Sequence, residues 1–212
     1  MRAGNLLLLI CGLAASIVYV GTDLVAASRY PGYSFTDQAV SELFAIGAPT
    51  RFLVVPLFSI ASLLLLAFAW GVWLSAGGSP MLRLVAVMSA ASAVDALILW
   101  NAFPMHMRGA ERTFTDTMHL ILGANPFVWL ALIFGATAFR GRFRTASIAT
   151  LILLVLPAVF AFRYVHALDM GEATPGLGLA ERVSQYGYQL WQAALALLLI
   201  NKTGTPLSRN AG

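Results

Sequence analysis

The sequence is poor in charged residues and has a single cysteine. Asp, Glu, Lys and Arg make up 10% of the 212 residues, while hydrophobic residues make up 59%. A soluble domain has about 25% charged residues, so this composition predicts a protein that is dissolved in a lipid bilayer. Cys11 alone excludes an internal disulfide and a cysteine metal cluster. The net charge is +4, but the basic residues do not form a cluster interleaved with aromatic residues, which is the pattern of a nucleic-acid-binding surface. No nucleic-acid partner is therefore expected.

Six apolar runs are present, and each is long enough to cross a bilayer, which takes about 20 residues. Backbone groups inside lipid must all be paired, so these runs are predicted to be helices. The expected fold is all-α, a six-transmembrane-helix bundle forming one membrane domain over residues 1–201, with a short cytoplasmic tail at 202–212. The spans are predicted at about 5–27, 52–76, 81–103, 115–139, 146–167 and 183–201.

Charges are distributed unequally between the two ends of these spans. The short loops at 77–80 and 140–145 carry or border arginines and have no acidic residue. Basic residues in short loops stay in the cytoplasm, so both the N- and C-termini are predicted to be cytoplasmic. All nine acidic residues and all three histidines then fall in outer loops or outer span halves. We expect a multi-pass protein of the cell membrane (inner or plasma), and twelve arginines against one lysine favour a GC-rich bacterial genome.

The first outer loop contains a Pro-Gly turn followed by a helix-start signal. Beyond it, Val40, Leu43 and Phe44 recur at helical spacing, opposite Ser41 and Glu42. This pattern predicts a short amphipathic helix that lies on the bundle or on the lipid surface.

Polar residues inside the spans are the candidates for a binding site, because ionisable groups in lipid usually face a cavity or a partner. Asp95 is the deepest, ~20 Å along its helix from the cytoplasmic end, and it either faces a pocket or pairs with Arg163 to clamp two helices. A glutamine stripe follows Glu181 along one face of the last span. The predicted ligand-binding residues are Asp95, His119, Arg163, Glu181, Arg182 and Gln185.

The three histidines and the many carboxylates lack the spacing of a metal site, such as HExxH or a tight histidine pair. We therefore expect no metal and no cofactor. No nucleophile motif such as GxSxG is present either, so the sequence identifies no catalytic residue.

Several short motifs occur in a fixed order: Pro31-Gly32-Tyr33, Ser41-Glu42-Leu43, Phe103-Pro104, His119, the segment 178–182 (GLAER) and Trp191. In order and spacing the chain resembles the bacterial and archaeal membrane family catalogued as domain of unknown function 998, over about residues 5–201. The resemblance implies six spans and no settled activity. The family commonly has an aspartate shortly after the Phe-Pro pair, where this chain has His106.

Three functions remain open. The leading hypothesis is binding of a small molecule or lipid headgroup in an outer-facing polar pocket, in a sensor, a transporter or an accessory subunit, with Arg163 and Arg182 suited to an anionic headgroup. The second is an intramembrane hydrolase or transferase that uses His119 with Asp95, with Ser41 or a metal-bound water as nucleophile. The third is a purely structural membrane subunit. The oligomeric state is not predicted.

Overall fold

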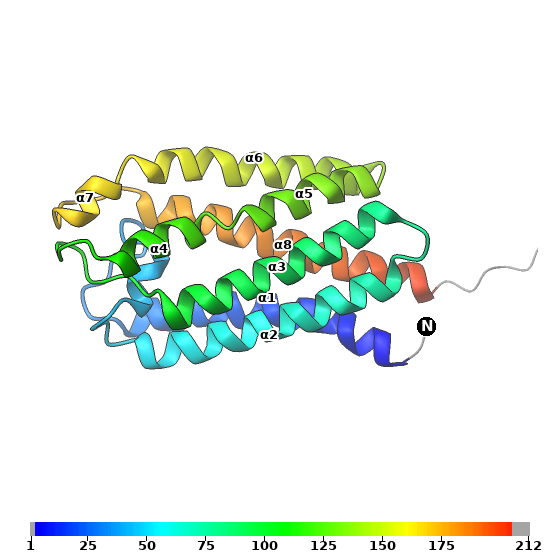
Figure 1. Cartoon of the computed structure of the whole chain (residues 1–212), viewed down its shortest axis with the longest axis horizontal. Helices are drawn as coiled ribbons and strands as arrows, with labels where there is room; N and C mark the ends of the chain where they lie inside the picture. The colour runs from blue at the N-terminus through cyan, green and yellow to red at the C-terminus, as the bar shows by residue number, and fades with distance from the viewer. Residues whose placement is uncertain (1–2, 205–212) are drawn as a thin grey trace, which may run out of the picture.

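The computed structural model describes residues 3–204, which form helices and loops without a strand. The long helices lie side by side in one elongated bundle (Figure 1). Residues 1–2 and 205–212, and with them most of the predicted tail, lie outside the described residues. The elements are α1 (Ala3–Arg29), η1 (Val40–Phe44), α2 (Arg51–Ser75), α3 (Pro80–Ala102), α4 (Phe114–Gly123), α5 (Pro126–Ala138), α6 (Arg142–Phe162), α7 (Val165–Asp169) and α8 (Leu177–Gly204).

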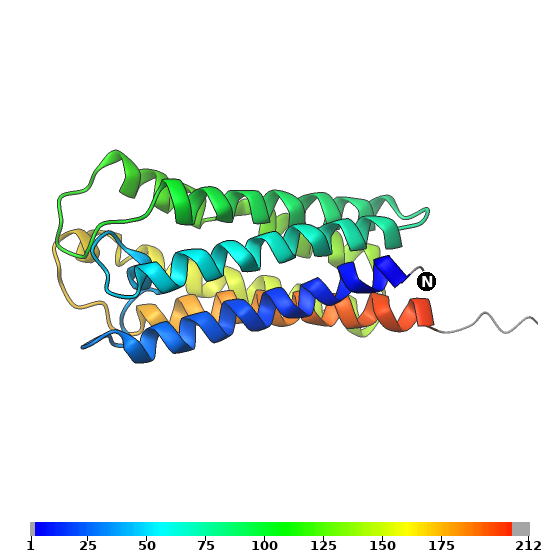
Figure 2. The same ribbon diagram turned by 90° about the horizontal axis from the view of Figure 1, so that it is seen from below.

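The helices pack as a closed ring in the order α1, α2, α3, α5, α6 and α8, with α8 returning to α1. Short connections at 76–79 and 139–141 join antiparallel neighbours at one end of the bundle. The long connections 30–50, 103–113 and 163–176 gather at the opposite end, which we call the capped end (Figures 1 and 2). The main packing partner of α4 is α3, so α4 lies beside the ring near the capped end.

Five segments of the described chain are long and apolar enough to cross a membrane. They are α1, α2, α3, α4 together with α5, and α6. They agree with five of the six predicted spans to within a few residues, and the chain is a multi-pass membrane protein. Helix α8 runs along the same bundle (Figure 2) but is not in this group. Its first half carries Glu181, Arg182 and two glutamines, and a third glutamine, Gln192, follows, which together lower its hydropathy.

The fourth predicted span is divided into two helices by Asn125. This residue has φ 34°, in the left-handed region that asparagine tolerates better than most side chains. Pro126 then begins α5, where a missing N–H costs nothing. The Asn125 Nδ2 donates to the carbonyl and the hydroxyl of Ser92, at 3.4 and 3.2 Å. The break therefore holds α4 and α5 against the middle of α3.

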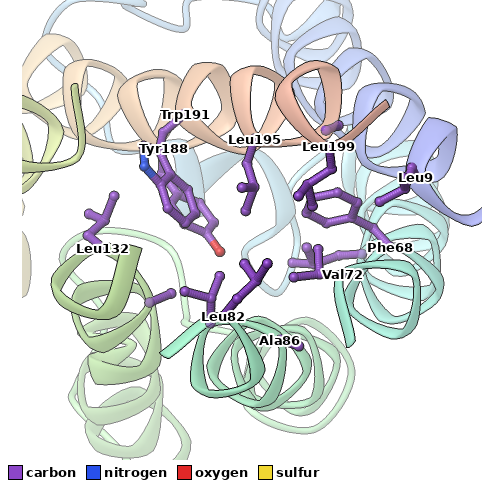
Figure 3. Close-up of a cluster of buried hydrophobic side chains, with 14 of the residues drawn as sticks. Leu9, Phe68, Val72, Leu82, Ala86, Leu132, Tyr188, Trp191, Leu195 and Leu199 are labelled. Carbon is purple, nitrogen blue, oxygen red and sulfur yellow. The ribbon is translucent and has the colours of Figure 1, made fainter. Parts of the chain in front are cut away.

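Small residues allow the helices to approach closely, which is the usual basis of packing inside a membrane. A Cβ added at Gly135 would lie 2.7 Å from the Trp191 ring, and one at Gly71 would lie 2.9 Å from the Leu8 Cβ. In Figure 3, side chains of α1, α2, α3, α5 and α8 point toward one another in an apolar core. Tyr188 belongs to this core and directs its hydroxyl toward α3 (Figure 3).

The short helix expected in the first outer loop is present as the 3-10 helix η1, and of the two predicted positions it takes the one on the bundle, packed against α1, α2 and α8. Val40, Leu43 and Phe44 are buried, and so is Glu42 on the face expected to be polar, with 1% of its surface exposed. Sequence periodicity could not reveal this, because the carboxylate of Glu42 is buried against a charge 66 residues away. The first long loop, residues 30–50, therefore folds into the end of the bundle.

The first turn of α8 passes directly against this loop at Gly178. A Cβ at this position would lie within 2.7 Å of the Phe35 carbonyl oxygen and closer still to that of Gln38. The next residue, Leu179, donates its N–H to the Thr36 carbonyl at 2.9 Å. Only glycine permits this approach of two backbones.

We predict that Gly178→Ala lowers the free energy of unfolding by about 1–3 kcal/mol, because α8 must move away from the loop. Gly187→Ala, on the same helix, is the matched control, since its Cβ would meet only side-chain atoms at 4.0 Å. That change is expected to be neutral or slightly stabilising. Thermal melting of both variants in a mild detergent measures the difference. Equal melting temperatures would contradict the close approach at Gly178.

Candidate functional site

A buried ion pair connects the first and last helices at the capped end. Asp23 of α1 is 0% exposed and Arg182 of α8 is 2% exposed. Two parallel hydrogen bonds join them, from Arg182 Nε to Asp23 Oδ2 at 2.9 Å and from Nη2 to Oδ1 at 2.8 Å. The Tyr186 hydroxyl donates a further short hydrogen bond to Asp23 Oδ2. This forked geometry suits a guanidinium and a carboxylate and holds the two helices in one register.

The same arginine holds the first long loop. Its Nη1 donates to the carbonyl oxygens of Phe35, at 2.6 Å, and Gly178, at 3.2 Å. Its guanidinium carbon lies 3.7 Å from the centre of the Phe35 ring, a cation–π contact. Its Nη2 donates to the Tyr33 hydroxyl at 2.9 Å. Burial raises the pKa of Tyr33, so this hydroxyl keeps its proton and donates it to the carbonyls of Gln38 and Ala39.

A second ion pair, between the partly exposed Arg108 and the buried Glu42, connects the first long loop with the loop between α3 and α4. Arg108 donates from Nε and Nη2 to the two carboxylate oxygens of Glu42, at 2.8 and 2.7 Å. The hydrogen bond to Glu42 raises the pKa of Arg108, so the guanidinium stays charged. The same arginine reaches the Glu172 carbonyl at 3.1 Å and the Thr174 hydroxyl at 3.3 Å. Arg108 therefore joins all three long loops of the capped end.

Asp37 and Asp169 fix the loop between α6 and α8. The Gly176 N–H donates to Asp37 at 2.9 Å and, with the Ser34 hydroxyl, lowers the pKa of Asp37. Asp169 forms a more exposed ion pair with Arg112 at 2.6 Å. These contacts close the capped end over the helices.

Beneath this cap lies a cavity of about 570 Å³. Every helix from α1 to α8 contributes lining residues, as do η1 and the loop between α3 and α4. Its walls carry large apolar side chains such as Phe44, Trp100 and Phe162. Polar side chains converge from several elements, among them Arg108, His119, Asn125, Glu181, Gln185 and Gln189.

His119 of α4 is 6% exposed and lines this cavity. Its Nδ1 lies 2.8 Å from the carbonyl oxygen of Phe103, the residue that follows α3. A carbonyl oxygen only accepts hydrogen bonds, so the proton sits on Nδ1 and Nε2 is left as an acceptor. Phe44 packs beside the ring at 5.7 Å between centres.

The structure brings three of the six predicted ligand-binding residues to one cavity, and these are His119, Glu181 and Gln185. Asp95, Arg163 and Arg182 are not among its lining residues. Arg182 is fully engaged by Asp23 and the first long loop. The considered pair between Asp95 and Arg163 does not form. Arg163 is exposed at the end of α6, where it lies over the Phe160 ring at 3.9 Å and bonds the Tyr164 hydroxyl.

Sequence reasoning missed Arg108 and the pair formed by His106 and Asp116. His106 Nδ1 lies 2.9 Å from Asp116 Oδ2, and its backbone N–H donates to Asp116 Oδ1 at 2.7 Å. Both residues line the cavity. His106 was noted only as a substitute for an acid, but the loop brings it onto the N-terminus of α4, where Asp116 also accepts from Thr113. Within residues 3–204, no three His, Cys, Asp or Glu side chains gather in a way that could hold a metal ion.

A comparison with family models identifies the chain. The model described as "Protein of unknown function (DUF998)" matches residues 13–198. The protein belongs to this family. The match confirms the resemblance expected from the motifs and covers all of the cavity. Searches of curated proteins and of solved structures found no match for this DUF998 protein.

The buried ion pair of Asp23 and Arg182 predicts how the unfolding free energy of this DUF998 protein changes in variants of the two residues. Asp23→Asn leaves the Arg182 cation buried without its partner, so we expect a loss of about 3–5 kcal/mol in unfolding free energy. The double change Asp23→Leu with Arg182→Met removes both charges and is expected to cost less than Asp23→Asn alone.

Thermal or denaturant unfolding in detergent measures these variants. Asp169→Asn is the control, because it breaks an ion pair in which both side chains are about a third exposed. It should cost no more than about 1 kcal/mol. If the double variant were as unstable as the sum of its single changes, Asp23 and Arg182 would not be energetically coupled.

Proposed function

We propose that this DUF998 protein spans the cell membrane six times, with both termini in the cytoplasm, and binds a small molecule or lipid headgroup in the outward-facing cavity. α8 is the sixth span in this proposal. Its polar first half packs against α1 and α6 rather than against lipid, which makes its low hydropathy compatible with a membrane position. Arg83, Arg142 and Arg144 lie at the short-loop end, which supports placing that end in the cytoplasm.

The cavity is the observation that carries the proposal. Ligand pockets commonly measure about 300–1,000 Å³, with apolar walls and a few convergent polar groups. The cavity of about 570 Å³ has this character, with His119, Glu181 and Gln185 among its polar groups. A subunit with a purely structural role has no need for a cavity of this size between its helices. A sensor, a transporter and an accessory subunit would each use such a pocket.

One observation favours a hydrolase or transferase as the second candidate. The Asp116 carboxylate holds His106 as an acid–base pair, and Ser41 lines the same cavity. The originally considered pairing of His119 with Asp95 receives no support, because His119 Nδ1 bonds the Phe103 carbonyl. Asp116 also accepts hydrogen bonds from Thr113 at the start of α4, which gives it a structural role without catalysis.

The orientation is tested by labelling single cysteines in intact cells after Cys11→Ala. Arg142→Cys and Glu111→Cys place thiols at exposed positions at opposite ends of the bundle. We expect a membrane-impermeant maleimide to label the cysteine at 111 and not the one at 142, because the capped end faces outward. Both sites should react after permeabilisation. Labelling at 142 alone in intact cells would reverse the assignment.

Binding is tested by filling the cavity. Gly123 lines it, and a Cβ at this position meets no atom within 4 Å. We expect Gly123→Phe to remove a co-purifying ligand that native mass spectrometry detects on the unchanged protein, because the ring occupies the ligand's space. Gly21→Phe is the matched control: it places the same ring on α1 in open space, outside the cavity lining. Identical ligand occupancy in the two variants, both folded by their melting curves, would exclude the cavity as the binding site.

A further inference from the structure

The positive charges at the cavity are already neutralised by the protein. Two arginines are among the described lining residues, Arg108 and Arg112, and no lysine. Arg108 makes a two-point contact with Glu42, and Arg112 makes one with Asp169. Arg182, next in sequence to a lining residue, is turned to Asp23. An anionic headgroup would have to compete with a protein carboxylate for each of these cations.

Glu181, by contrast, has a carboxylate on the cavity and no cation partner. Its Oε2 accepts the N–H of Val40 at 2.7 Å, which is the one hydrogen bond that the structure shows for this side chain. The ion pairs found among residues 3–204 do not include it. Asp116 is the other lining carboxylate without an arginine partner, and His106 is its neighbour. With its carboxylates ionised, the lining therefore carries an excess of negative charge, which is costly in an apolar setting until a proton or a bound cation neutralises it.

Among the neutral polar groups of the lining, His119 presents an acceptor. In the neutral imidazole, Nε2 accepts because Nδ1 holds the proton. The side-chain oxygens of Asn125, Gln189 and Gln192 also have no hydrogen-bond partner among the described residues, but each is buried and does not open to the cavity. A bound group that donates a hydrogen bond would satisfy His119 Nε2, and one that only accepts would not.

Aromatic rings and an apolar wall complete the cavity. Tyr19, Phe44 and Trp100 line it and pack together with Phe58, and the Phe44 ring lies 5.7 Å from the His119 ring between centres. Cations bind aromatic faces favourably. Another part of the lining is apolar and includes Leu120 of α4 and Val159 of α6. α4 packs mainly on α3, and α6 on α5 and α8, so the cavity extends between two helices that are not packed closely against each other.

We propose that the ligand is a cationic amphiphile, with an ammonium group near Glu181 and an apolar chain between α4 and α6. This inference rests on the proposed binding function and names its ligand class. The ammonium supplies the missing positive charge and faces the aromatic cluster. The apolar chain of the ligand occupies the part of the cavity between α4 and α6. An amphiphile that is dissolved in the bilayer would keep its tail in an apolar environment when it binds there.

The experiment compares three ligands that share a twelve-carbon chain and differ in their headgroup: dodecylammonium, dodecanol and dodecanoate. Their binding to the full-length protein in a neutral maltoside detergent is measured by native mass spectrometry over a concentration series. We expect dodecylammonium, which carries a positive charge and three N–H donors, to bind most tightly and dodecanoate most weakly, with a ratio of dissociation constants of about tenfold or more. Gly123→Phe should abolish binding of the ammonium compound.

Glu181→Gln identifies the group responsible for the charge preference. The glutamine oxygen still accepts the Val40 N–H, so the first long loop keeps this contact while the charge is lost. We expect the ammonium ligand to lose about tenfold or more in affinity, and dodecanol to be unaffected. Glu111→Gln, the same change at an exposed position outside the cavity, should alter neither.

Each outcome separates this inference from the binding function itself. If none of the three ligands binds to the unchanged protein at a site sensitive to Gly123→Phe, the binding function fails and the ligand class with it. If dodecanoate binds most tightly at that site, binding stands and the cationic class is wrong. Equal affinity for all three headgroups also overturns the cationic class. These decisions come from the unchanged protein and do not depend on the folding of Glu181→Gln.

Discussion

The buried pair of Asp23 and Arg182 is the interaction on which the capped end depends. Arg182 donates from Nε and Nη2 to the carboxylate of Asp23 in α1. Its Nη1 donates to carbonyl oxygens of the first long loop and of α8. One side chain therefore joins the first helix, the last helix and the loop that closes the bundle. A buried pair of this kind gives little net stability over an apolar pair, but it is strongly destabilising when one partner is missing. Its contribution is to fix the position of the loop.

The fixed position of the first long loop also determines which polar groups face the cavity. The loop brings Glu42 onto Arg108 and the N–H of Val40 onto Glu181. Arg108 and Arg182 are thus paired with carboxylates of the capped end itself. The carboxylate of Glu181 is left at the cavity without a cation. The whole chain is cationic, with a net charge of +4, whereas the lining of the cavity is acidic. Net charge describes the whole chain and its short-loop end, and it does not describe the cavity.

The helical architecture follows from the sequence because bilayer thickness and backbone pairing leave few alternatives for apolar runs. The break in the fourth span has a local cause, because asparagine tolerates the left-handed conformation and Pro126 is well placed only at the start of a helix. The site was only partly predictable. His119, Glu181 and Gln185 share one cavity, but position along a helix does not tell which way a side chain turns. Arg182 turned to Asp23, and Arg163 turned outward onto aromatic rings. The partner of Arg182 lies 159 residues away, and no local pattern encodes such a contact. The neighbours of Arg163 are local, but the sequence does not tell that its side chain turns to them and away from Asp95.

The separation of Asp23 and Arg182 along the chain has a consequence for biosynthesis. The carboxylate enters the membrane with the first helix, and its partner is made 159 residues later. Until then the nascent protein carries a lone acid in a hydrophobic segment, a state that is tolerated only near water or with the carboxyl protonated. The ion pair that holds the first long loop therefore cannot form before the start of α8 has been made. A chain interrupted before residue 182 would leave an incompletely packed intermediate with this acid exposed, a feature by which membrane quality control could recognise it.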